Sequence, residues 1–196
     1  NGTPPGFTND PTGLSKGAVI SLRNLIQIPR NTNLFYDGRD RVGATTAIAV
    51  TRAMWAQDPG PMLAGAVEVI PKMDHGSYFI CPVGENVSAN YMFEYVGLFV
   101  MAGNNNTAVT IDRDGNGPND PVTVVLNRGE SHHINGGILK GATVRASLPV
   151  QAHLITGDIN ANYESRWYTL FPYEQWHSSY LTPVGTSSNG YECYVF

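Results

Sequence analysis

Apolar and polar residues alternate in short runs along most of the chain, and glycine, proline, asparagine or aspartate separates most of these runs. Alternation with a period of two places successive side chains on opposite faces of a β-strand. Many short strands at this spacing are typical of a sandwich or barrel. The sequence therefore predicts an all-β, sandwich-like fold without long helices. The expected strands lie within residues 18–28, 45–55, 64–71, 77–84, 91–102, 107–112, 121–127, 142–147, 150–157, 166–172, 179–185 and 191–196.

Two distant stretches of the chain share a pattern of matching residues. Residues 66–84, AVEVIPKMDHGSYFICPVG, align without a gap with residues 167–185, WYTLFPYEQWHSSYLTPVG. Just before them, residues 42–55 align with residues 144–157 at an offset one residue larger. Repeats of this kind mark architecture rather than chemistry, so we expect two duplicated β-units. The expected division is an extended arm or linker at 1–17, a first β-unit at 18–90, connecting strands with an Asp/Gly/Asn loop at 91–120, and a second β-unit at 121–196.

Composition supports the prediction of a β-rich fold and limits the classes of partner that we expect. Charged residues make up only 14% of the chain, which also contains 21 glycines and 13 prolines, and this balance favours sheets and turns over long helices. The net charge of −4 gives no reason to expect nucleic acid or an anionic membrane as a partner. No apolar stretch approaches the length of a membrane-spanning helix.

The beginning of the chain and its cysteines suggest an extracellular setting. The chain begins at Asn1 without a methionine or a signal peptide, so we expect a processed or excised piece. Cys81 and Cys193 then form either one disulfide bond or two unrelated buried thiols. The sequons at Asn1, Asn86 and Asn105 permit N-glycosylation if a suitable host secretes the chain.

The segment DRDGNGPND at 112–120 has the opening pattern of a calcium-binding loop. Calcium prefers six to eight oxygen ligands, which alternate positions of a curled loop turn inward, and Gly117 allows the tight turn. Thr123 stands where such loops carry a bidentate glutamate, and Asp-Gly and Asn-Gly are also common in plain hairpin turns. A structural calcium site and a solvated turn therefore both stay open. The expected ligands are Asp112, Asp114, Asn116, Pro118 through its carbonyl group, and Asp120.

Two other kinds of chemistry have weaker signals. The histidines His132, His133 and His153 lack a metal-binding spacing, and neighbours in a strand point to opposite faces, so we expect a polar strand and one buried histidine. A serine hydrolase would need a G-x-S-x-G turn, which is absent. A glycosidase would need two carboxylates that the fold brings together. The residues that could form such a pair are Glu68, Glu94, Asp158 and Glu164.

Aromatic residues gather between residues 163 and 180. Exposed aromatic rings stack on sugars, whereas buried rings fill a core. Trp167 and Phe171 align with apolar residues of the first copy, which favours core positions for these two. Tyr173 and Trp176 lie in the loop between prolines and are the expected glycan contacts if the domain is a carbohydrate-binding module.

A resemblance to a known family rests on three phrases. They are VRASLPVQAHLITG (144–157), FPYEQWHSSYLTPVG (171–185) and a looser first copy, VGATTAIAVTRAMW (42–55). These phrases resemble the β-rich N-terminal domain of IgGFc-binding protein and its bacterial relatives in large secreted or surface-anchored proteins. The resemblance covers most of residues 18–196 through short structural motifs. The chain departs from the family pattern where Lys-Pro becomes Leu148-Pro149 and where the first copy has Ala47 in place of the proline.

The resemblance implies an extracellular adhesive or scaffold role and brings no catalytic residues. We therefore expect a non-catalytic structural or adhesive domain of a larger surface protein or assembly, with a carbohydrate-binding module as the alternative and a hydrolase as the least favoured function. The apolar end of the chain, 191–196, and the arm 1–15 are candidates for adding a strand to the sheet of a neighbouring domain or copy. Glycans and surface proteins are the other expected partners.

Overall fold

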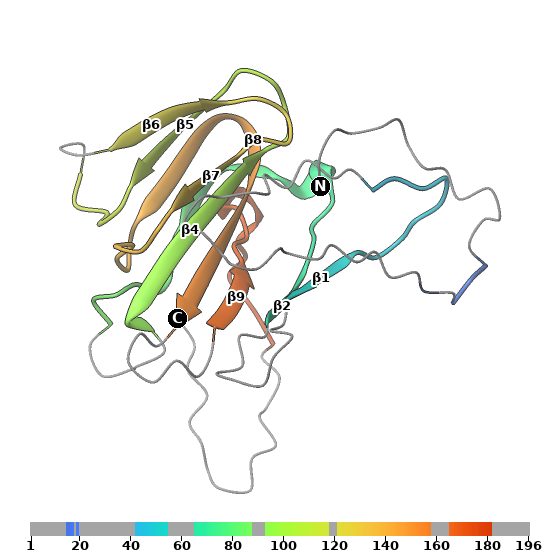
Figure 1. Ribbon diagram of the computed structural model, residues 1–196, viewed down its shortest axis with the longest axis horizontal. Helices are drawn as coiled ribbons and strands as arrows, with labels where there is room; N and C mark the ends of the chain where they lie inside the picture. Colours follow the sequence, from blue (N-terminus) through green and yellow to red (C-terminus); the bar gives the residue numbers. More distant parts are fainter. Residues whose placement is uncertain are drawn as a thin grey trace, which may run out of the picture.

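The computed structural model describes residues 15–17, 19, 42–54, 65–87, 93–117, 121–157 and 165–181. Its strands pair antiparallel, which confirms the all-β class, whereas the sandwich arrangement stays a prediction (Figure 1). In this described part, no helix is long and apolar enough to cross a membrane. The elements are β1 (Thr51–Met54), β2 (Gly65–Glu68), the 3-10 helix η1 (Lys72–Asp74), β3 (Gly76–Ile80), β4 (Tyr95–Ala102), β5 (Thr107–Asp112), β6 (Val122–Leu126), β7 (Ser131–Ile134), β8 (Thr143–Gly157), β9 (Ser165–Thr169) and the 3-10 helix η3 (Tyr173–Gln175).

The long strand β8 organises the main sheet. Its first half pairs with β5 and β3, and its second half pairs with β4 and β9. Val150 pairs with Ala102 of β4 and with Gly76 of β3, so these two strands lie on opposite edges of β8. Strands β6 and β7 pair with the outer edges of β5 and β4. Four strands therefore depend on one strand for their position.

Strand β8 bulges where it changes neighbours. Between the pairs Gly76–Val150 and Tyr78–Arg145, β3 advances two residues while β8 spans five. Residues 147–149 pair with neither edge and are exposed. Proline has no N–H group to donate and is tolerated in a sheet at a bulge, so Pro149 fits here. The predicted break between strands 142–147 and 150–157 is therefore wrong, because one strand runs through the proline.

Three other predictions of strand positions differ from the structure. Of the predicted run 45–55 only Thr51–Met54 is a strand, and residues 42–50 belong to no sheet in the described structure. Residues 179–181 form no strand, whereas β7 lies outside the predicted runs. The predicted runs 18–28 and 191–196 lie outside the described residues.

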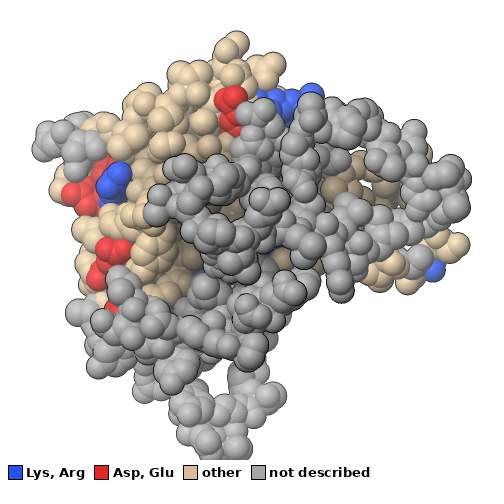
Figure 2. All heavy atoms as spheres, viewed as in Figure 1, with Lys and Arg blue, Asp and Glu red and all other residues tan. Residues whose placement is uncertain are grey.

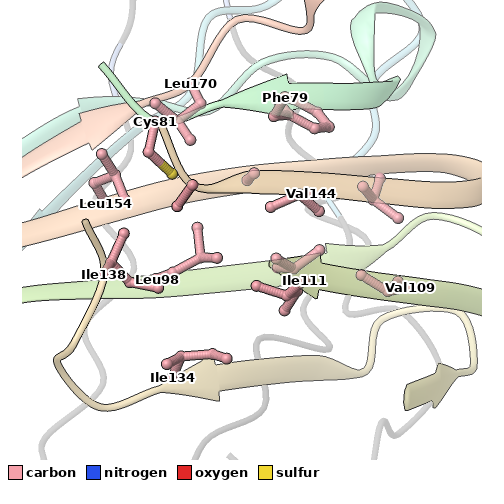
Figure 3. Packing of buried hydrophobic residues seen from close by; sticks show 14 of the residues in the cluster. Phe79, Cys81, Leu98, Val109, Ile111, Ile134, Ile138, Val144, Leu154 and Leu170 are labelled. Atoms are coloured by element: carbon pink, nitrogen blue, oxygen red, sulfur yellow. The ribbon is translucent and has the colours of Figure 1, made fainter. Parts of the chain in front are cut away.

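The core lies on one face of the main sheet and alternates along its strands. In β4, Val96, Leu98 and Val100 are fully buried, and β8 adds Leu154 from the neighbouring strand. Figure 3 shows Leu98 and Leu154 packed among residues from β3, β5 and the loop before β8. Burial of a large apolar side chain contributes about 1.5–3 kcal/mol, so this cluster is the main source of stability. The other core residues include Phe79, Cys81, Ile111, Ile134, Ile138 and Val144.

The two aligned stretches form hairpins with the same register. In the first, Thr51 of β1 pairs with Glu68 of β2, and in the second, His153 of β8 pairs with Thr169 of β9. These pairs occupy matching positions in the alignment, and a 3-10 helix follows each hairpin. The hairpins also touch, because Thr169 Oγ1 donates a hydrogen bond to the carbonyl oxygen of Glu68 at 3.1 Å. Duplication of the chain and the proposed unit boundaries stay predictions.

Candidate functional site: an exposed aromatic surface

The helix η3 is fixed against the start of β3. The carboxylate of Glu174 accepts a hydrogen bond from the Ser77 backbone N–H at 3.1 Å and another from the Ser77 hydroxyl group. Burial raises the pKa of Glu174, but the hydrogen bonds from Ser77 and neighbouring backbone groups outweigh it and lower this pKa. A Cβ atom on Gly76 would lie 2.0 Å from Cβ of Pro172, so only glycine allows this approach. The contact also occupies an N–H group of an edge strand, which open edges otherwise present to other chains.

Aromatic side chains gather around η3 and form what we call the aromatic surface. Phe171, Tyr173, Trp176 and Tyr180 are 60%, 51%, 46% and 66% exposed, and half-buried Tyr78 of β3 joins them. The exposure of Tyr173 and Trp176 agrees with the sequence prediction. The predicted core position of Phe171 is wrong, because β9 ends at Thr169 and this ring lies outside the sheet.

Contacts within the aromatic surface hold its rings in place. The ring centroids of Tyr78 and Tyr173 are 5.5 Å apart, and those of Tyr173 and Trp176 are 5.0 Å apart. The indole N–H of Trp176 donates to the carbonyl oxygen of Phe171 at 3.2 Å. On β8, the guanidinium of Arg145 lies 4.0 Å from the centroid of the Tyr78 ring, a distance at which a cation is attracted to the ring face. The arrangement of these rings therefore does not depend on a bound partner.

The rings of the aromatic surface are tilted rather than coplanar. The Tyr78 and Tyr173 planes meet at 56°, and the Tyr173 and Trp176 planes meet at 49°. A flat row of rings suits stacking along an extended sugar chain, whereas tilted rings form corners that suit a protruding group. The arrangement can bind apolar, aromatic or sugar faces through stacking and through the hydroxyl and indole groups at the ring edges.

The proposed calcium loop is held together by its own backbone. Oδ1 of Asp112 accepts hydrogen bonds from the N–H groups of Gly115 at 2.9 Å and Asp114 at 3.3 Å, and Oδ1 of Asp114 accepts one from Asn116 at 3.1 Å. Burial raises the pKa of Asp112, but the backbone hydrogen bonds outweigh it and lower this pKa. In the described part of the chain, no group of three or more His, Cys, Asp or Glu residues could hold a metal ion. The remaining proposed ligands, Pro118 and Asp120, lie outside the described residues, so calcium binding stays a prediction.

Replacing Asp112 by alanine should lower the free energy of unfolding by about 1–2 kcal/mol, because it removes the acceptor of the loop amides. Urea unfolding followed by circular dichroism would measure this loss, with Asp112→Asn as the matched control that keeps one acceptor oxygen. We expect the loss to persist in EDTA. A wild-type melting temperature that falls in EDTA would show that calcium adds to these bonds, and an unchanged stability of Asp112→Ala would contradict their importance.

The predicted disulfide and glycosylation positions are only partly within the described structure. Cys81 is 1% exposed and has no disulfide partner among the described residues, and burial raises the pKa of its thiol to about 12. Its proposed partner Cys193 lies outside the described residues, so the bridge stays a prediction. Asn1 also lies outside them. Asn86 and Asn105 are exposed, and each Oδ1 atom accepts a backbone hydrogen bond, from Lys140 at 2.8 Å and from Arg128 at 3.0 Å. N-glycosylation would modify Nδ2 and leave these acceptors in place.

The second face of the main sheet carries polar residues that sequence reasoning only partly anticipated. Four residues share this polar face, which lies opposite the core: His133, Gln151, His153 and Trp167. They alternate with buried apolar residues along their strands, and the pairing of the strands places them on the same side of the sheet. His153 is 6% exposed, which confirms the predicted buried histidine, and its Nδ1 lies 3.3 Å from Thr169 Oγ1. Its ring meets the Trp167 ring edge-on at 5.7 Å. The signal in the sequence is that Gln151 and His153 alternate with apolar residues in a strand that the sheet encloses.

Several buried polar atoms, on this face and elsewhere, have no hydrogen-bond partner in the described structure. Unpaired buried polar atoms cost free energy, so each one is a weak point in the packing. The atoms are His75 Nδ1, His133 Nε2, Gln151 Oε1, Thr156 Oγ1 and Trp167 Nε1. Protonation of the buried imidazoles would add charge to a face that has few groups to receive it.

Of the carboxylates considered for a hydrolase, Glu68 lies on β2, where its Oε1 accepts a hydrogen bond from Thr51 Oγ1 at 2.7 Å. Glu94 precedes β4, and Asp158 and Glu164 lie outside the described residues. The chain matches no protein-family model, no curated protein and no solved structure. The resemblance to the N-terminal domain of IgGFc-binding protein therefore stays a prediction that rests on the quoted phrases.

Proposed function

We propose that the chain is a non-catalytic extracellular domain with a structural or adhesive role. The observation that carries this proposal is the aromatic surface, in which exposed rings are held by contacts within the fold. Exposed apolar patches on soluble proteins mark sites of interaction, and tyrosine and tryptophan dominate the binding energy of interfaces. Rings that are already ordered lose little entropy on binding.

The charged groups beside the aromatic surface are engaged within the fold, which supports contact with a neutral partner. Glu174 accepts hydrogen bonds from Ser77, and Arg145 is engaged with the ring of Tyr78. Elsewhere, the described atoms that are visible in Figure 2 include few charged side chains. The extracellular location rests on composition, the sequons and the family resemblance. A structural calcium ion in the loop 112–120 belongs to the same proposal.

Carbohydrate binding is the second candidate, and the exposure of Tyr173 and Trp176 favours it. Their tilted planes favour a sugar that protrudes into the corner between the rings over one that lies flat along a row. In either case the same two side chains make the principal contact.

The double variant Tyr173→Ala/Trp176→Ala should lose binding by tenfold or more, since truncation of an aromatic anchor typically costs more than about 1.4 kcal/mol. Binding would be measured on a glycan array and on plates coated with extracellular matrix proteins. Tyr168→Ala is the control, because Tyr168 is 38% exposed but belongs to β9. Wild-type protein that binds none of these surfaces, or a double variant that binds like wild type, would contradict the proposed adhesive role.

A further inference from the structure

Residues 42–49, which we call the free arm, have a strand-like sequence but pair with no strand in the described part of the chain. The segment VGATTAIA is exposed at every position, although it contains Val42 and Ile48, which are 50% and 48% exposed. The ladder with β2 ends just after it, where the N–H of Val69 donates to the carbonyl oxygen of Val50 at 2.8 Å. In the described structure the free arm therefore presents its backbone groups and apolar side chains together.

The free arm corresponds to the central strand of the main sheet. In the aligned frame Val42 matches Val144 and Ile48 matches Val150, and both residues of β8 are 0% exposed. The hairpin registers support this alignment, because β1 pairs with β2 as β8 pairs with β9. On both sides of its bulge, the matching part of β8 has neighbours on both edges, whereas the free arm has none among the described residues. The arm therefore aligns with a doubly paired strand but lies without such neighbours in the described structure.

The same molecule has an open sheet edge, on β6, that is uncharged like the free arm. Strand β6 pairs with β5 on one edge only, and its sequence VTVVL has no charge, no proline and an outward Val125 that is 63% exposed. On two other edge strands, Glu174 occupies the N–H of Ser77 on β3, and Thr169 of β9 is bonded to β2. Charges and covering groups are how proteins protect open edges, whereas β6 carries no charge and its second edge pairs with no strand of the described structure.

We propose that the free arm of one copy adds as a strand to the β6 edge of a second copy. Both segments are uncharged and rich in β-branched residues, so pairing brings no charge into the interface. Eight extended residues reach about 26 Å, which is enough to cover a strand of five residues. Main-chain hydrogen bonds give such strand addition its affinity.

The placement of the two segments makes the contact intermolecular. Figure 1 shows β1 and the chain before it on one side of the molecule and β6 on the opposite side. One copy therefore cannot pair its arm with its own β6 while keeping this fold. A contact between two different surfaces is heterologous and generates a ring or an open filament. The inference rests on the structural role proposed above and names its partner as a second copy of the chain.

The test uses two variants that block opposite halves of the contact. The arm-blocked variant Ala47→Pro/Ile48→Pro removes two N–H donors from a segment that makes no sheet contact in the monomer. The edge-blocked variant Val125→Lys places a charge on β6. Met73→Lys is the control, because Met73 is 86% exposed on η1, which belongs to neither segment. Light scattering after size-exclusion chromatography would give the masses from micromolar to millimolar concentration.

Wild type and Met73→Lys should form a series of oligomers that grows with concentration, and each blocked variant should remain a monomer with an unchanged melting temperature. A mixture of the two blocked variants should form a dimer of one copy each, because one intact arm and one intact edge remain. Monomeric wild type at every concentration would overturn the inference. So would blocked variants that assemble normally, a mixture that stays monomeric, or hydrogen exchange showing amides 42–49 protected in the monomer.

The two proposals fail separately. The arm-blocked variant keeps the aromatic surface, so its binding to glycans or matrix proteins reports on adhesion alone. Assembly without adhesion would contradict the adhesive role and support strand addition. Adhesion without assembly would contradict strand addition and support the adhesive role.

Discussion

Replacing Gly84 by alanine should lower the free energy of unfolding by about 3 kcal/mol or more, near the upper end of the cost of overpacking. A Cβ atom at this position would lie 2.0 Å from the backbone nitrogen of Lys140 and 2.1 Å from the carbonyl carbon of Leu139. Both are backbone atoms of the segment that leads into β8, so no side-chain rotation relieves the overlap. The N–H of Glu85 also bonds to the carbonyl oxygen of Ile138 at 2.9 Å, which fixes the two segments together.

The measurement is urea unfolding followed by tryptophan fluorescence. Gly43→Ala is the matched control, because no atom lies within 4 Å of its added Cβ position, and we expect its unfolding midpoint to stay within the range of neutral surface substitutions. Equal midpoints for Gly84→Ala and wild type would show that the two backbone segments do not meet as closely as the structure places them.

Acid should destabilise the protein well above the pH at which ordinary carboxylates protonate. Burial first, and then the charges of Arg52 and His75, lower the pKa of His153 from 6.5 to about 4. The unfolded chain therefore binds a proton at His153 near pH 6.5, whereas the folded chain resists until about pH 4. Between these values the unfolded state holds more protons, so stability is present above pH 6.5 and is lost as the pH falls. Complete loss amounts to up to about 3 kcal/mol.

The variant His153→Gln isolates this effect, because glutamine does not titrate. Its free energy of unfolding should fall by up to about 3 kcal/mol less than that of wild type between pH 7 and pH 4. Burial also lowers the pKa values of His75, His132 and His133, so part of the acid sensitivity should remain. His177→Gln is the control on an exposed loop. Identical pH profiles for His153→Gln and wild type would contradict the prediction.

The period-two pattern predicted the fold class and the strands whose neighbours lie close in sequence. β5 was predicted at 107–112 and occupies Thr107–Asp112, because alternating residues between two turns leave no other structure favoured. The pattern failed at Pro149, where a long-range change of neighbours makes a bulge favourable inside one strand. It also failed at 45–50, where strand-like residues have no neighbour to pair with in the described structure.

The candidate site could be predicted only in part for the same reason. Tyr173 and Trp176 stand in a loop between prolines, and this local signal indicated exposure. Tyr78 lies far away in sequence, and the contact of Glu174 with Ser77 that brings it beside Tyr173 follows from packing alone. The polar face has a similar origin, since β4, β7 and β9 meet β8 through long-range pairing.

The dependence of four strands on β8 determines the order in which the chain can fold. β5 with β6 and β4 with β7 are near in sequence, so these pairs can form while synthesis continues. β3 must wait for β8, which begins at Thr143, and β8 must then pair along both edges at once. Contacts across such sequence separations make folding slow and leave intermediates with unpaired edges exposed. The growing chain therefore remains an incomplete sheet until β8 has been synthesised.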